Sequence, residues 1–232
     1  MLITLEGGEG TGKTTQAELL VAQLRAEGYP ARQTREPGGT PLGTAIRALL
    51  MHPDESLRAL AEAGLAAPDG PAEEMLPITE VLLLSADRAQ HVARMHEWLA
   101  DGEVIVCDRY ADATRAYQGA ARGLDIKAIA QAEALATGGL KPDLTLLFDL
   151  PAEEGQRRRQ GARAAGGEWN RLDREALAFH ERVRQGYLTL AAEEPKRWVV
   201  LDATPPVETL AEQVWSVVSE RLPDKRDDLK RR

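Results

Sequence analysis

Short apolar runs alternate along the chain with longer segments in which apolar residues recur at helical spacing. Five runs have the length of strands, and they cover residues 2–5, 31–34, 103–107, 144–150 and 198–201, of which the run at 31–34 is the weaker. Such alternation is typical of a parallel sheet that helices cover on both faces. We therefore expect a three-layer α/β fold with a five-stranded parallel sheet. Ligands of these sheets bind beyond the carboxyl ends of the strands.

The longest helical pattern runs through residues 73–100. We expect one stripe of it to face the core, and its residues are Met75, Ile78, Leu82, Ala89, Val92, His96 and Leu99. Leu84 and Arg88 are four residues apart and share a different face. From the pattern alone, Arg88 is either a solvated helix charge or a fixed functional cation. We interpret His91 on that face as a surface histidine, and His52 and His180 likewise.

Two segments lack a core pattern. Residues 53–77 are rich in alanine and contain Pro68-Asp69-Gly70-Pro71, which predicts a surface excursion with a turn. Residues 222–232 include eight charged side chains, and we expect a charged flexible tail there. The remaining length, residues 1–221, suits a single domain.

Charge and cysteine content narrow the classes of partner and setting. A net charge of -8 disfavours a general nucleic-acid or membrane-surface binder, because both need a basic field. The single cysteine, Cys107, cannot form an internal disulfide, and we interpret it as a buried strand residue. With no signal peptide or long apolar stretch, the expected location is the cytoplasm. No cluster of histidine and cysteine indicates zinc.

A phosphate-binding loop follows the first apolar run directly. Residues 7–14 read Gly-Gly-Glu-Gly-Thr-Gly-Lys-Thr, and leucines at helical spacing come next. Glycines let the backbone turn its N–H groups toward phosphates at the start of a helix. We expect Lys13, as an exposed loop cation, to reach the β and γ phosphates and Thr14 to hold Mg²⁺. A glycine-rich turn without a ligand is the alternative, but it does not need the Lys-Thr pair.

The phosphate loop alone does not separate kinases from switches or motors. A GTPase would need Asn-Lys-x-Asp and Asp-x-x-Gly strings, and the chain has neither. It has instead a glycine-interrupted cationic stretch that contains Arg157, Arg158, Arg159, Arg163, Arg171 and Arg174. We interpret this stretch, at about residues 155–171, as a lid that closes on transferring phosphates. A solvated helix end or a polyanion patch is the other interpretation.

Several strings together resemble the bacterial thymidylate kinase family. Residues 6–15 carry the phosphate loop, and residues 34–40 read Thr-Arg-Glu-Pro-Gly-Gly-Thr, the most diagnostic string. Further matches lie at residues 108–110, 116–119 and 141–144, with a weaker one at 170–173. The resemblance spans most of the chain in the family's order.

This resemblance implies a P-loop kinase fold with an arginine-rich lid. It implies ATP-dependent phosphorylation of dTMP to dTDP, with ATP and Mg²⁺ as cofactors and, by analogy, a homodimer. Two alternatives stay open at this point. One is a kinase for another nucleoside monophosphate on the same fold, and the other is a nucleotide-binding regulator without turnover.

The resemblance also assigns residues to the two substrates. ATP would meet Gly7, Gly8, Glu9, Gly10, Thr11, Gly12, Lys13, Thr14, Thr15 and Arg158, with Thr14 and Asp108 at the metal. The acceptor would meet Glu9, Arg35, Leu84, Arg88, Arg109, Thr114, Tyr117 and Gln118.

Individual roles follow for part of the acceptor set. Glu9 would meet the 3′-hydroxyl, Arg35 and Arg109 the phosphate, and Arg88 a thymine carbonyl, while Thr114 contacts the base and Tyr117 crowds the 2′ position. A guanidinium presents paired donors to oxygens and keeps its charge. Whether Asp108 orients Mg²⁺ hydration or fixes Arg109 stays open.

Two departures from the family pattern, and one feature that matches its bacterial branch, affect these expectations. Leu84 stands where the family commonly has an aromatic residue, and the 53–77 excursion is longer than usual. Gly10 stands where the eukaryotic branch has an arginine, so the lid has to supply the transition-state cation. The expected catalytic set is therefore Lys13, Arg109, Arg163 and Arg171.

Overall fold

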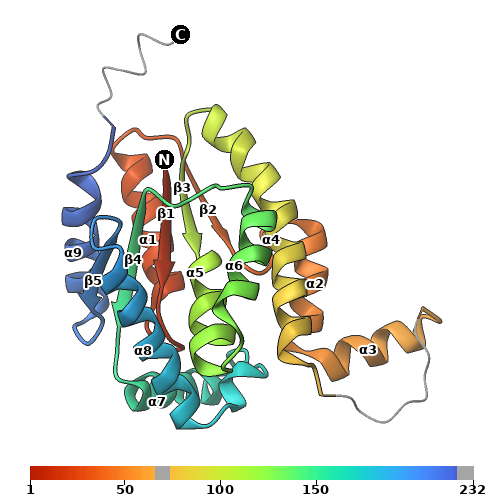
Figure 1. Cartoon of the computed structure of the whole chain (residues 1–232). Helices are drawn as coiled ribbons and strands as arrows, with labels where there is room; N and C mark the ends of the chain where they lie inside the picture. Colours follow the sequence, from red (N-terminus) through yellow and green to blue (C-terminus); the bar gives the residue numbers. More distant parts are fainter. Residues whose placement is uncertain (66–73, 224–232) are drawn as a thin grey trace.

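The computed structural model describes residues 1–65 and 74–223. These residues contain one five-stranded parallel sheet with the strand order β2-β3-β1-β4-β5 (Figure 1). The strands are β1 (Leu2–Glu6), β2 (Ala31–Arg35), β3 (Val104–Asp108), β4 (Leu144–Asp149) and β5 (Trp198–Asp202). Each strand begins and ends within one residue of its predicted run, so the predicted five-stranded parallel sheet is confirmed.

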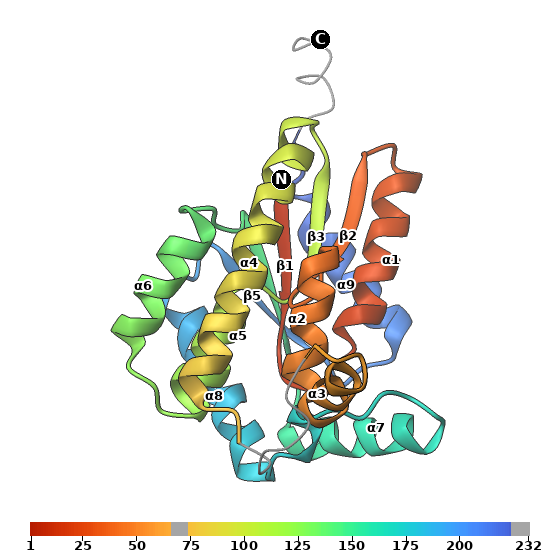
Figure 2. The ribbon, with the colours of Figure 1, turned by 90° about the vertical axis from the view of Figure 1, so that its right-hand side faces the viewer.

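Helices cover both faces of the sheet, which gives three layers (Figures 1 and 2). Helices α1 (Lys13–Ala26) and α9 (Val207–Ser219) pack together on one face. Helices α4 (Pro77–Ala100) and α8 (Leu177–Glu193) cover the other face, with the π-helical turn η1 (Arg115–Ala121) beside α8. Alternate strand residues supply the two cores, since Ile3 packs toward α1 while Leu2 and Cys107 pack toward α4. The buried position predicted for Cys107 is confirmed.

The remaining helices extend these layers. Helices α2 (Pro41–Met51) and α6 (Ile126–Thr137) pack against α4, and the short α5 (Ala111–Thr114) leads into η1. Helix α7 (Ala152–Ala164) follows β4, and a 3-10 turn, η2 (Leu172–Arg174), precedes α8. None of these described helices is long and apolar enough to cross a membrane.

The stripe predicted to face the core on the long helix is largely wrong. Leu82 is 60% exposed, Ile78 is 44% exposed, and Ala89 and His96 are also exposed. The buried face consists of Glu80, Val81, Asp87, Arg88, His91, Val92 and Met95. The surface interpretation is also wrong for His91, which is fully buried, and for His180, which is 5% exposed. The buried face of α4 contains polar side chains whose hydrogen-bond partners lie far away in the sequence. The pattern of apolar residues therefore did not identify this face.

The 53–77 excursion lies at the surface, as predicted, in its described part. Helix α3 (Pro53–Glu62) has no buried residue and projects from the body of the molecule in Figure 1. The predicted turn at residues 68–71 lies outside the described residues, as do residues 224–232 of the predicted tail. Leu222, at the start of that tail, packs against the core beside α9.

Candidate functional site

The phosphate loop joins β1 to α1 at the carboxyl end of the sheet. Gly7, Gly10 and Gly12 adopt φ angles of 142°, 75° and 87°, in the left-handed region that glycine enters without strain. At Gly10 a Cβ atom would lie 2.3 Å from the carbonyl oxygen of Gly155, so the loop also packs closely on α7. No side chain caps the start of α1, which leaves its first N–H groups available to an anion.

Lys13 is folded back onto this loop. Its Nζ donates to the Gly8 carbonyl at 2.6 Å and to Thr11 Oγ1 at 3.1 Å. The residue is only 6% exposed, so its expected position as an exposed cation is wrong. Burial, and then the nearby charge of Arg109, lower the pKa of Lys13 to about 8. The ammonium therefore remains mostly charged at neutral pH and lies where phosphate oxygens would meet the loop.

Thr14 and Asp108 meet across the carboxyl ends of β1 and β3. The Thr14 hydroxyl donates to Asp108 Oδ2 at 2.6 Å. Hydroxyl and carboxylate oxygens are ligands that Mg²⁺ accepts, usually together with water and phosphate oxygens. These two oxygens suit a Mg²⁺ ion whose other ligands are water and the phosphate oxygens of a nucleotide.

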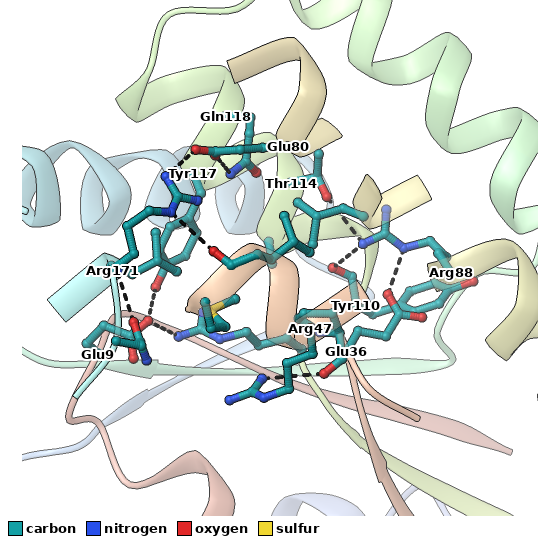
Figure 3. Close-up of a pocket in the computed structure, with 18 residues that line it drawn as sticks. Glu9, Glu36, Arg47, Glu80, Arg88, Tyr110, Thr114, Tyr117, Gln118 and Arg171 are labelled. Carbon is teal, nitrogen blue, oxygen red and sulfur yellow. Dashed lines mark hydrogen bonds and ion pairs between the residues drawn. The ribbon is translucent and has the colours of Figure 1, made fainter. Parts of the chain in front are cut away.

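Two adjoining pockets open at this edge of the sheet. One, the P-loop cleft, is lined by residues 9–15 together with Arg35, Asp108, Arg158 and Arg159. The other, the α4 pocket, is lined by Leu84 and Arg88 of α4 together with Leu50, Met51, Thr114, Tyr117, Gln118 and Leu172 (Figure 3). Both pockets share Glu9, Glu36, Arg47, Arg109 and Asn170. A molecule in one pocket would therefore meet a molecule in the other at these residues.

Arg109 ties the phosphate loop to the junction of the pockets. It directly follows β3 with a φ angle of 70°, which is uncommon for a residue with a side chain. Its guanidinium donates to the Gly7 carbonyl at 2.9 Å and to Glu9 Oε1 at 2.6 Å. Arg35 is exposed and lines the P-loop cleft. Both predicted phosphate ligands therefore lie at the P-loop cleft.

Arg47 of α2 was not predicted as a site residue. It lines both pockets, and burial followed by the charge of Arg35 lowers its pKa. The sequence offered one signal, since Arg47 lies less than two turns beyond Thr40, the residue that caps α2. A third guanidinium at this junction adds to the positive field for a phosphate.

Glu9 is held as a carboxylate. Its Oε1 accepts from Arg109 and from the Tyr117 hydroxyl, the latter at 2.9 Å. Burial acts to raise its pKa, but the charges of Arg109 and Lys13 and the Tyr117 hydrogen bond outweigh burial and lower the pKa to about 2. An ionised carboxylate only accepts hydrogen bonds, so Glu9 suits a hydroxyl donor.

Arg88 is buried at the floor of the α4 pocket. Its Nε donates to Glu36 Oε2 at 2.8 Å, and its Nη2 donates to the Tyr110 carbonyl and to Thr114 Oγ1, both at 3.2 Å (Figure 3). The residue is 1% exposed, which decides against a solvated helix charge. These bonds fix the plane of the guanidinium, as a polar reader of a ligand requires.

The walls of the α4 pocket combine apolar and amide groups. Leu84 packs with Leu50, Met51 and Leu172, and together they form an apolar wall. Gln118 donates through Nε2 to Glu80 Oε2 at 2.8 Å, while its buried Oε1 has no partner among the described residues. A flat apolar group with polar edges fits between such walls.

Glu80, which the sequence did not single out, joins three parts of the structure. Besides Gln118, its carboxylate accepts from Arg122 at 3.0 Å and from Arg171. Glu80 lies in the first turn of α4 and is 1% exposed. Glu80 therefore orients Gln118 in the α4 pocket, and it also binds Arg171, which lies in the segment before η2.

The arginines of the predicted lid lie in three different places. Arg158 and Arg159 line the P-loop cleft, where Arg158 donates to the Ala203 carbonyl at 3.0 Å and Arg159 pairs with Asp173. Arg171 lines the α4 pocket and donates to the Leu50 carbonyl at 3.2 Å. Arg163 is exposed on α7, with its guanidinium 4.8 Å from the centre of the Trp169 ring. Of the four lid arginines Arg158, Arg159, Arg163 and Arg171, the first two thus line the P-loop cleft and the last two do not.

Comparison with known proteins finds similar sequences over nearly the whole chain. The thymidylate kinase family model matches residues 5–214. A thymidylate kinase from Desulfosudis oleivorans is 49% identical over 231 residues, which cover 97% of this chain and 98% of that protein. Thymidylate kinases from Thermomicrobium roseum and Deinococcus radiodurans are 49% and 47% identical, and the matches cover 94% and 95% of this chain and 94% and 97% of those proteins. This chain belongs to the thymidylate kinase family.

Proposed function

We propose that this chain transfers the γ-phosphoryl group of ATP to dTMP and releases dTDP and ADP. The observation that carries the proposal is the meeting of two unlike pockets at Glu9 and Arg109. The P-loop cleft has the backbone and cations for a triphosphate, and the α4 pocket has the apolar walls and buried guanidinium for a base. The named relatives add the acceptor, dTMP, and give no support to another monophosphate or to a regulator without turnover.

Positioning and charge account for most of the catalysis in this site. Lys13 and the N–H groups at the start of α1 stabilise charge on the donor phosphates, and Arg35 and Arg109 hold the acceptor phosphate in line with them. Glu9 accepts a hydrogen bond from the 3′-hydroxyl, while Arg88 donates to a thymine carbonyl. Thr14 and Asp108 would hold Mg²⁺, which neutralises charge on the phosphates when it is bound.

The partners that we propose are two small molecules, ATP and dTMP. The net charge of -8 disfavours extended polyanions, while the arginines and Lys13 concentrate positive charge at the site. A cytoplasmic setting stays a prediction from the lone Cys107.

A monophosphate panel tests the function. ADP release is measured with ATP and Mg²⁺ alone, and then with dTMP, dUMP, dCMP or UMP in turn. We expect release to depend on the acceptor and to be most efficient with dTMP. If another monophosphate were turned over more efficiently, that monophosphate and not dTMP would be the acceptor. ATP binding without acceptor-dependent ADP release would contradict the kinase proposal.

The lid supplies the cation that Gly10 leaves out of the phosphate loop. In the described structure Arg159 is the best placed, because it lines the P-loop cleft and is oriented by the buried carboxylate of Asp173. Arg163 and Arg171, which the family pattern favours, would have to leave Trp169 and Glu80 to reach the transferring phosphate.

We expect Arg159→Gln to lower kcat by about tenfold or more at saturating ATP and dTMP, with little change in KM for dTMP. A cation that acts on the transition state changes the maximal rate more than ground-state binding. Arg163→Gln, on the same helix, is the matched control and should stay near the original rate. The melting temperature of each variant is recorded, because Arg159 also pairs with Asp173. A slow Arg163→Gln beside an unaffected Arg159→Gln would move the role to Arg163.

We also propose a homodimer in which α4 contributes to the interface. Ile78 and Leu82 lie four residues apart on its outer face and are 44% and 60% exposed, and Leu42 on the neighbouring α2 is 54% exposed. A second copy would cover apolar side chains that otherwise contact water.

Leu82→Lys should convert the dimer into a monomer, because it places a charge in the apolar contact. Sedimentation velocity measures the change across a range of protein concentrations. Leu19→Lys is the matched control, since Leu19 is 40% exposed on α1, across the sheet. A monomeric original protein, or a dimer that survives Leu82→Lys, would contradict this interface.

A further inference from the structure

The segment at residues 34–40 contains Arg35, a proposed ligand of the acceptor phosphate. The residues on either side of Arg35 are Thr34 and Glu36, and both form hydrogen bonds with side chains of α4. Arg35 lies at the end of β2. Glu36 is 3% exposed and accepts from Arg88, the proposed reader of the base. One of the phosphate contacts and one of the base contacts of the acceptor, Arg35 and Arg88, thus come from this segment and from α4. The position of Arg35 relative to Arg88 therefore depends on the contacts that join the 34–40 segment to α4.

His91 provides that lock. It lies one turn after Arg88 on α4 and is fully buried. Its Nδ1 contacts Glu36 Oε1 at 3.0 Å, and its Nε2 contacts Thr34 Oγ1 at 2.6 Å. A carboxylate oxygen accepts, so Nδ1 donates to Glu36. Both ring nitrogens are therefore engaged with the residues on either side of Arg35.

Close packing removes other positions for the ring. A Cβ atom added at Gly39 would lie 2.3 Å from His91 Nε2, so only glycine lets the 34–40 segment approach this closely. One turn back on α4, Asp87 Oδ1 accepts from the Gly38 N–H at 3.0 Å. Helix α4 thus forms hydrogen bonds with the segment at Thr34, Glu36 and Gly38, on both sides of Arg35.

We infer that His91 is a positioning residue for the acceptor nucleotide, which makes base recognition and phosphate recognition depend on each other. This inference rests on the proposed function. Glu36 is the shared element, because one carboxylate oxygen orients Arg88 and the other is oriented by His91. Without His91, Glu36 Oε1 loses the donor that orients it and Thr34 loses its side-chain partner, so the positions of Arg88 and of the segment that carries Arg35 become less fixed. Substrate then has to restore that geometry from its binding free energy.

The expected signature is confined to the acceptor. His91 does not line the P-loop cleft. Its partner Glu36 does, but Lys13 and Thr14 make their hydrogen bonds to Gly8, Thr11 and Asp108 and not to Glu36, so their contacts with ATP stay in place. A lost hydrogen bond to a charged group corresponds to about a tenfold to hundredfold effect. We expect His91→Ala to raise KM for dTMP by about tenfold or more and to lower the preference for dTMP over dCMP, with KM for ATP changed less than about twofold.

The experiment compares His91→Ala, His91→Gln and Val92→Ala in the full-length protein. Val92 is the matched control, because it is buried on the same helix but packs in the core beside Met95 rather than on the 34–40 segment. Kinetics with both substrates and calorimetric binding of dTMP are measured below the melting temperature of every variant. Val92→Ala should lower the melting temperature without an acceptor-specific change in KM. His91→Gln, which keeps a donor amide, should recover part of the dTMP affinity.

A double variant tests whether His91 acts through Arg88. If it does, His91→Ala should reduce base discrimination much less in an Arg88→Gln background than alone. The inference would be overturned if the effects of His91→Ala and Arg88→Gln on base discrimination were fully additive. It would also be overturned if KM for dTMP rose in proportion to the loss of melting temperature in both His91→Ala and Val92→Ala. An equal rise in KM for ATP would also overturn it. These failures differ from failure of the proposed function, in which the original protein itself would not phosphorylate dTMP.

Discussion

Lys13→Ala should lower the maximal rate with ATP and dTMP by about 10²- to 10³-fold. Loss of one preorganised donor to a transferring group typically has this effect. Lys13 Nζ contacts only the phosphate loop itself in the described structure, through Gly8 and Thr11. Its removal therefore spares the core of the sheet. The measurement is steady-state ADP release at saturating substrates, together with thermal unfolding.

Lys127→Ala is the control for this prediction. Lys127 is an exposed lysine on α6, so this variant removes one positive charge from the protein without touching the P-loop cleft. It should keep its rate. Near-normal turnover in Lys13→Ala would show that the loop assignment of this residue is wrong.

Arg88→Ala should damage both stability and base recognition. The pair with Glu36 is buried, and removal of one partner from a buried pair typically costs about 3–5 kcal/mol, because the remaining charge is left uncompensated. The variant should unfold at a clearly lower temperature. Below that temperature, its efficiency with dTMP should fall more than its efficiency with dCMP, because the charged donor to the thymine carbonyl is gone.

Arg94→Ala is the matched control on the same helix. Arg94 pairs with Glu97 at the surface, where such pairs contribute about 1 kcal/mol or less. Neither the melting temperature nor the substrate preference should change appreciably. An Arg88→Ala protein with the stability of Arg94→Ala would contradict the buried pair, and an unchanged substrate preference would remove Arg88 from the acceptor site.

Local spacing was sufficient to predict the sheet and the phosphate loop. Strands β1, β3, β4 and β5 are short runs of mostly apolar residues, while β2, Ala-Arg-Gln-Thr-Arg, gives a weaker signal. The loop's glycines and its Lys-Thr pair are likewise adjacent in the chain, so the order of strand, loop and helix is visible directly. These predictions agree with the structure to within a residue at the strand ends.

The face of α4 could not be predicted in this way. Its buried side chains include Glu80, Asp87, Arg88 and His91, and each has a hydrogen-bond partner far away in the sequence. Glu36, for example, lies 52 residues before Arg88. A helical pattern of apolar residues locates an apolar face but carries no record of such pairs. The apolar pattern therefore assigned Ile78 and Leu82 to the core, although both are exposed in the structure.

The lid shows the same limit for charged residues. Composition reveals that arginines are concentrated near α7 but not where each one points. Asp173 directs Arg159 toward the P-loop cleft, while Glu80 and Leu50 hold Arg171 at the other pocket. The sequence accordingly predicted a cationic segment, and the described structure distinguishes its members.

Transfer of a labelled phosphoryl group tests the central claim most directly. The protein is incubated with Mg²⁺, dTMP and ATP that carries an isotopic label in its γ-phosphoryl group, and the products are separated and analysed by mass spectrometry. We expect label in the β-phosphoryl group of dTDP, in an amount equal to the ADP formed. Label found only in inorganic phosphate, or ADP formed without dTDP, would contradict it.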